Sequence, residues 1–235
     1  MLTHDPKILA LAFIGGMIPS LVWLWFWLKQ ESKGPEPRQL LAITFVMGMI
    51  AVVVVLAVEK FIKIHVDSPS GRLILWASAE EIVKYLAALV VLYKTNYIDE
   101  PIEWPIYMIT VALGFAALEN ALFLIKPLAA GATVVGLLTG QLRFLGSTLL
   151  HTVASGILGI AVGISYQMLG WKRAWHLLMG FVCAIALHTV FNFFIMRNNG
   201  EDVLKVFAFL WVVTIIVMLL YERLRKMSYQ PNLLS

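Results

Sequence analysis

Charge is scarce in this sequence. Only 14% of its 235 residues are Asp, Glu, Lys or Arg, whereas 60% are apolar, and the mean hydropathy is +0.85. Soluble globular domains carry about 25% charged residues, so this composition excludes that class. A chain of this length that consists mostly of spans has no room for a soluble domain. We therefore expect residues 1–235 to form a single integral membrane domain.

Cysteine and glycosylation signals are also nearly absent. Cys183 is the only cysteine, so an intrachain disulfide is excluded, and the sequence holds no Asn-X-Ser/Thr acceptor. The net charge of +4 comes from Lys and Arg residues that gather in short loops between apolar runs, as orientation signals do. The expected partner of the chain is therefore the lipid bilayer and not a nucleic acid.

Long apolar runs make up most of the sequence. A spanning helix needs about 20 mostly apolar residues, and the runs predict an all-α, polytopic transmembrane helix bundle with seven or eight spans. The segment 126–141, short and rich in Gly and Ala, decides between seven and eight, and 59–71 is expected to be a polar connection. The predicted spans cover residues 8–28, 40–58, 73–93, 106–125, 142–169, 174–196 and 203–221.

A few ionisable residues lie well inside these apolar runs. A charged side chain near the bilayer centre costs about 2.5 to 3.5 kcal/mol on insertion scales, so such residues must face one another or a water-filled cavity. We therefore expect a buried polar site among the central helices. Its expected members are Glu80, Glu81, Lys84, Glu119, His151 and His188.

Helical spacing favours this convergence. Glu80 and Lys84 are four residues apart and share a helix face, and Glu81 lies about 100° around the helix beside them. His188 and Asn192 are also four apart, which places an imidazole and an amide on one stripe.

The charges in the predicted site do not balance. Three glutamates and one lysine leave an excess of two negative charges if both histidines are neutral. A divalent cation would offset this excess, and so would protonation of one glutamate together with one histidine. The sequence leaves both routes open.

Three short motifs resemble those of PrsW-type intramembrane proteases, within the wider superfamily of CAAX-prenyl endoproteases and bacteriocin-processing enzymes. Residues 80–84 are Glu-Glu-Ile-Val-Lys and match EExxK, residues 115–119 are Phe-Ala-Ala-Leu-Glu and match FxxxE, and residues 188–192 are His-Thr-Val-Phe-Asn and match HxxxN. The motif-bearing core is expected within about 73–196.

The resemblance implies an endopeptidase that cleaves a membrane-anchored protein or peptide, such as an anti-sigma factor-like protein, in the plasma membrane of a prokaryote. Glu119 stands where the CAAX-processing branch has a histidine, and Lys84 replaces an arginine one position earlier. Because of these differences, we do not expect prenyl-CAAX specificity.

Peptide hydrolysis requires an activated water, a stabiliser for the oxyanion and an acid for the leaving amine. We expect Glu80 or Glu81 to be the general base and Lys84 to keep one glutamate ionised. His188 and Asn192 would stabilise the oxyanion.

A metal is the open alternative for the remaining residues. His151 and Glu119 would hold the water or, with His188, a divalent cation such as Zn²⁺, because His and Glu ligands with an open position are typical of catalytic zinc. The rival function is a proton- or ion-coupled transporter, which would use the same buried Glu, His and Lys residues.

Overall fold

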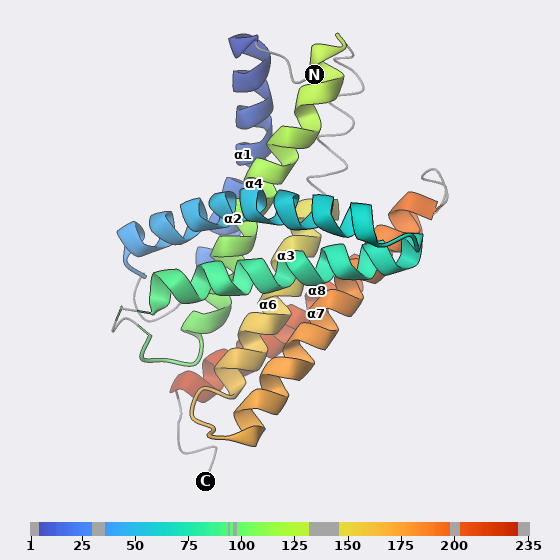
Figure 1. Cartoon of the computed structure of the whole chain (residues 1–235). Helices are drawn as coiled ribbons and strands as arrows, with labels where there is room; N and C mark the ends of the chain where they lie inside the picture. The colour runs from blue at the N-terminus through green and yellow to red at the C-terminus, as the bar shows by residue number, and fades with distance from the viewer. Residues whose placement is uncertain are drawn as a thin grey trace.

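The computed structural model describes residues 5–29, 36–93, 95, 98–131, 146–197 and 203–229. These residues form seven α-helices and no strand, which confirms the all-α prediction (Figure 1). The helices are α1 (Pro6–Leu28), α2 (Arg38–His65), α3 (Pro69–Leu92), α4 (Glu103–Ala129), α6 (Thr148–Ile164), α7 (Trp171–Arg197) and α8 (Val203–Tyr229).

Five of these helices, α1, α2, α4, α7 and α8, are long and apolar enough to cross a membrane. The other two differ for separate reasons: α3 carries three charged residues in its middle, and α6 has only 17 residues. The chain is therefore an integral, multi-pass membrane protein. The choice between seven and eight spans depends on residues 126–141, most of which lie outside the described part.

Several predicted boundaries are wrong, including the end of the last span, since α8 continues to Tyr229. The connection expected at 59–71 is helical for most of its length, since α2 continues to His65 and α3 begins at Pro69. Charged residues mark where a helix leaves the apolar layer, and they do not end it. The span expected at 142–169 is a shorter helix in the described residues, α6, which ends at Ile164.

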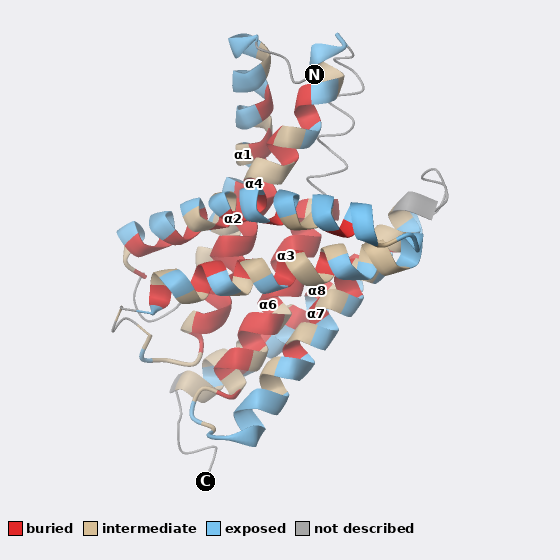
Figure 2. Ribbon diagram, viewed as in Figure 1, coloured by how far each residue is buried: buried red, intermediate tan, exposed pale blue. Residues whose placement is uncertain are grey.

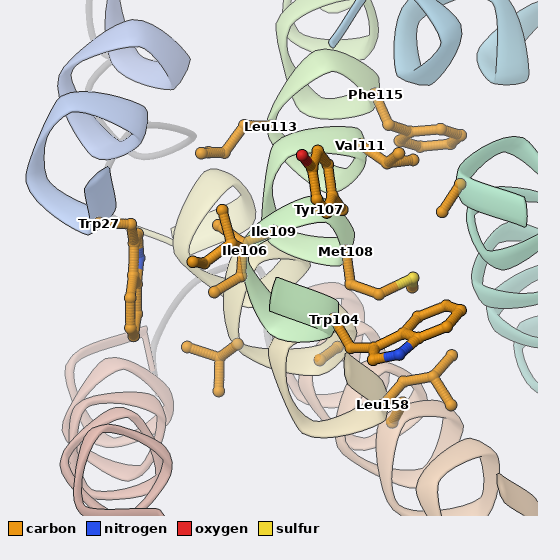
Figure 3. Packing of buried hydrophobic residues seen from close by; sticks show 14 of the residues in the cluster. Trp27, Trp104, Ile106, Tyr107, Met108, Ile109, Val111, Leu113, Phe115 and Leu158 are labelled. Atoms are coloured by element: carbon orange, nitrogen blue, oxygen red, sulfur yellow. The ribbon is translucent and has the colours of Figure 1, made fainter. Parts of the chain in front are cut away.

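Helix α4 lies at the centre of the molecule. Its residues from Trp104 to Ala117 are buried without interruption, and α1, α2, α3 and α6 pack against it (Figure 2). A helix that is apolar on all sides requires such a central position. In Figure 3, Trp27 of α1 and Leu158 of α6 flank the side chains of α4.

Helices α2 and α3 form an antiparallel pair that lies across α4 (Figure 1). A short turn joins them, in which the Ser68 hydroxyl accepts a hydrogen bond from the Gly71 amide at the start of α3. The Arg72 guanidinium donates to the carbonyl oxygens of Val66 and Asp67, at 2.6 and 2.9 Å. These bonds fix how α3 leaves the turn.

Glycines permit the close crossing of α2 and α4. A Cβ atom on Gly48 would overlap the Val111 carbonyl oxygen, and one on Gly114 would overlap the Phe45 carbonyl oxygen. Small residues at such a crossing allow two backbones to approach. The crossing holds the α2–α3 pair against α4, next to the turn of α4 that carries Glu119.

Candidate active site

The three charged residues in the middle of α3 are buried at the centre of the bundle. Glu80 is 5% exposed, and Glu81 and Lys84 are fully buried. The Lys84 ammonium donates to Glu81 Oε1 at 2.6 Å and lies 3.9 Å from Glu80 Oε2. Glu80 and Lys84 share one helix face, as the spacing predicts. Together with Glu81 they form an ion-pair network within a single helix.

His151 of α6 and His188 of α7 complete the network from the facing helices. Their rings meet edge to face, with centroids 5.1 Å apart, and both side chains are buried. His188 Nε2 lies 3.7 Å from Glu80 Oε2, and His151 Nδ1 lies 3.8 Å from the same oxygen. One ring nitrogen of each histidine thus faces Glu80.

The other ring nitrogen of each histidine meets a different carboxylate. His188 Nδ1 is 3.0 Å from Glu81 Oε1, and His151 Nε2 is 3.1 Å from Glu119 Oε2 on α4. In metal sites the ligating histidine commonly donates its second N–H to a carboxylate, which fixes the tautomer and the ring orientation. Both histidines have this arrangement, with their first nitrogens directed at one point.

The atom that one ring nitrogen of each histidine faces is Glu80 Oε2. It is buried and has no hydrogen-bond partner among the described residues, although a buried carboxylate oxygen is normally satisfied. Ligand atoms of Glu80, His151 and His188 all lie within 4.8 Å of one another. Two imidazole nitrogens and a carboxylate oxygen form a ligand set that zinc accepts, so these residues fit a divalent cation.

Lys84 limits how a cation would enter this set. Its ammonium lies 3.0 Å from His151 Nδ1, so lysine and cation compete for the same nitrogen lone pair. The ammonium also lies over the Phe115 ring, 4.8 Å from its centroid. Its shorter contact, at 2.6 Å, is with Glu81 Oε1.

Glu119 is the most accessible carboxylate of the network, with its side chain 21% exposed. Besides His151, it accepts a hydrogen bond from the Ser147 hydroxyl at 3.4 Å. The sequence hypothesis grouped Glu119 with His151 and His188 as metal ligands. In the structure Glu80 occupies the position between the two inner histidine nitrogens, and Glu119 holds the outer nitrogen of His151.

Asn192 is the one predicted site residue that does not join the network. It lies one turn after His188 on α7 and is half-buried. Among the described residues it makes no hydrogen bond or ion pair with the buried charges. Its expected role at the oxyanion stays a prediction.

Two hydroxyl contacts were not predicted from the sequence. The Ser155 hydroxyl donates to Glu81 Oε2 at 2.9 Å, so both oxygens of Glu81 accept hydrogen bonds. The Thr148 hydroxyl accepts a hydrogen bond at 2.9 Å from the side-chain amide of Asn120, the residue that follows Glu119 in the sequence. Ser155 lies four residues after His151 on the same helix face, and this spacing is the sequence feature that could have indicated its contact with the site.

Known proteases resemble this chain over most of its length. The chain matches a family described as "PrsW family intramembrane metalloprotease" over residues 36–220. It is 28% identical to Protease PrsW of Geobacillus kaustophilus over 78% of this chain and 79% of that protein. It is 26% identical to Protease PrsW of Clostridioides difficile over 94% of this chain and 95% of that protein.

No solved structure matches the chain significantly. The matched range 36–220 includes every charged residue and histidine of the buried network. A protease family does not favour the transporter alternative. The chain therefore belongs to the PrsW family of intramembrane metalloproteases.

Proposed function

We propose that this protein is a metal-dependent endopeptidase that cleaves membrane-associated proteins, with Glu80, His151 and His188 as the ligands of a divalent cation such as Zn²⁺. The observation that carries the proposal is Glu80 Oε2, which is buried without a hydrogen-bond partner among the described residues and is faced by two histidine nitrogens at 3.7 and 3.8 Å. A cation bound there would polarise the scissile carbonyl and stabilise the negative charge that develops on its oxygen.

Charge supports the same proposal. Glu80, Glu81 and Glu119 carry three negative charges, and Lys84 returns one. An excess of two negative charges inside a bundle of low dielectric requires compensation, and a divalent cation supplies it in full.

The remaining residues divide into positioning and proton-transfer roles. Glu81 accepts hydrogen bonds from Lys84 and Ser155 and contacts His188, so it orients the His188 ring. Glu119 is partly exposed and joined to His151 Nε2, which suits a carboxylate that takes a proton from water and passes it to the leaving amine. In this assignment Glu119 is the general base, and Glu80 is a ligand.

The substrate class follows from the site's location. Ligands from α3, α6 and α7 lie inside the bundle, so a peptide bond reaches them only from a segment in or beside the membrane. An anti-sigma factor-like protein with one span is one candidate, and the plasma membrane of a prokaryote is the expected compartment.

The test uses purified full-length protein in lipid vesicles with a single-span reporter substrate. Cleavage and bound metal are measured for the unchanged protein, for Glu80→Gln and for Glu222→Gln, a control whose carboxylate pairs with Arg225 on α8. We expect Glu80→Gln to lose both cleavage and metal, and a chelator to abolish cleavage until Zn²⁺ is restored. Full cleavage by metal-free protein would overturn the proposal.

A further inference from the structure

A fourth glutamate lies beside the network, on α2. Glu59 continues the buried stripe of that helix, which includes Val52, Val55 and Ile62, and its side chain is half-buried. A glutamate in such a stripe replaces an apolar side chain at a cost in desolvation. Among the described residues its carboxylate makes no hydrogen bond or ion pair.

The α2–α3 contact places Glu59 near the cluster. The Trp76 indole N–H donates to the Glu59 backbone carbonyl at 3.3 Å. Trp76 lies one helical turn, about 6 Å, before Glu80 on the same face of α3. Glu59 is therefore held on the neighbouring helix beside Trp76, which lies one turn before the proposed metal ligand.

Electrostatics connects the same carboxylate with residues on two further helices of the site, α4 and α7. Glu59 lies within electrostatic range of Glu119, which repels its charge, and of His188, which attracts it. Glu59 and Glu119 are both partly exposed, whereas Glu80 and Glu81 are buried. The exposed edge of the network therefore carries two carboxylates. With Glu59 counted, the four carboxylates exceed by one charge what Lys84 and one divalent cation offset.

We infer that Glu59 is a further residue of the site, and that its negative charge at the outer edge strengthens the binding of a divalent cation by Glu80, His151 and His188. This inference rests on the proposed function, because it assumes the cation site. Glu59 does not act as a ligand. It attracts the cation through space and raises its local concentration beside the site.

The experiment titrates Co²⁺ into chelator-treated, full-length protein in detergent and follows the absorption of the bound ion. We expect Glu59→Gln to bind Co²⁺ roughly threefold more weakly than the unchanged protein, because a charge acting through space contributes less than a carboxylate hydrogen-bonded to a ligand. Glu59→Asp keeps the charge and should restore most of the affinity. Glu222→Gln, which removes a carboxylate on α8, should bind normally.

Salt separates a charge effect from local packing. Raising KCl to about 1 M shortens the screening length to about 3 Å. The difference in Co²⁺ affinity between the unchanged protein and Glu59→Gln should therefore shrink. Equal Co²⁺ affinity for Glu59→Gln and the unchanged protein, with binding lost in Glu80→Gln, would overturn this inference alone. Weakening in Glu59→Asp as large as in Glu59→Gln would also overturn it. Absence of Co²⁺ binding by the unchanged protein would overturn the cation site as well.

Discussion

His188 Nδ1 lies 3.0 Å from Glu81 Oε1, the same oxygen that accepts a hydrogen bond from the Lys84 ammonium. One carboxylate oxygen thus joins the HxxxN helix to the EExxK helix. Because Ser155 occupies the other oxygen of Glu81, both oxygens of this carboxylate hold neighbouring side chains in place. The two adjacent glutamates of the motif therefore have different roles, since Glu81 orients side chains and Glu80 presents an unbonded oxygen.

The Glu81–Lys84 pair predicts a specific pattern of stability. Glu81→Gln leaves the fully buried Lys84 without its nearest counter-charge, and breaking a buried pair costs about 3 to 5 kcal/mol. The double variant Glu81→Gln, Lys84→Met removes the unpaired ammonium and should recover much of that loss. Thermal unfolding in detergent of both single variants and the double variant measures the coupling. Strictly additive losses would contradict the pairing.

Substitutions of Glu119 and Glu80 should have different effects on kcat and on metal binding. Glu119→Gln removes the partly exposed carboxylate that we assign to proton transfer, and kcat should fall roughly 100-fold or more while the metal is retained. Glu80→Gln should lose the metal itself. Metal content and kcat measured on the same preparations distinguish the two roles. Metal loss in Glu119→Gln with retention in Glu80→Gln would exchange the assignments and favour the ligand set Glu119, His151 and His188.

Glu36, outside the spans, predicts a pH effect on stability. Its side chain is buried just before α2 and accepts a hydrogen bond from the Tyr107 hydroxyl of α4. Burial raises the pKa of Glu36, with Asp99 and Glu100 adding to the rise and the Tyr107 hydrogen bond opposing it. The folded protein therefore binds this proton more tightly than the unfolded chain does.

The sign follows from that difference in proton binding. The stabilisation is fully present below the unfolded pKa of Glu36 and is lost as pH rises through the raised, folded pKa. Glu36→Gln should flatten this decline and unfold at a higher temperature than the unchanged protein at neutral pH. Tyr107→Phe, which removes the donor, should lower stability at neutral pH. Parallel pH profiles for Glu36→Gln and the unchanged protein would rule out this role.

The α2–α4 crossing predicts intolerance of even one methyl group. Gly114→Ala places a Cβ atom against the Phe45 carbonyl oxygen, which is backbone and cannot rotate away, so we expect a loss of about 1 to 3 kcal/mol. Gly156→Ala on α6 is the matched control, because its added Cβ would meet Ile109 side-chain atoms at an ordinary 3.5 Å. Thermal unfolding compares the two. Equal stability of both variants would show that the helices separate freely at this crossing.

Much of the architecture was predictable because the bilayer permits few solutions. Apolar runs of about 20 residues must be helices, and charged residues inside them must meet, so the pattern at Glu80, Glu81 and Lys84 predicts a buried site. Hydropathy does not determine where a helix ends beyond the apolar layer. For that reason the extension of α2 through Glu59 to His65 was not foreseen.

The detailed roles within the site depend on tertiary geometry. Spacing along one helix places Glu80 and Glu81 side by side, but it does not show which of them faces His151 or which accepts the Ser155 hydrogen bond. Asn192 shares a helix face with His188, but this spacing does not by itself bring it into contact with the network, and its role at the oxyanion stays a prediction.

The central claim is that Glu80, His151 and His188 hold a catalytic cation, and X-ray absorption at the zinc edge tests it most directly. Purified, active protein should contain about one Zn²⁺ with a first shell of two imidazole nitrogens at about 2.0 to 2.1 Å and oxygen ligands at similar distances. His188→Gln should remove one imidazole from that shell. Active protein without bound metal, or a shell that keeps two imidazoles in His188→Gln, would contradict the account.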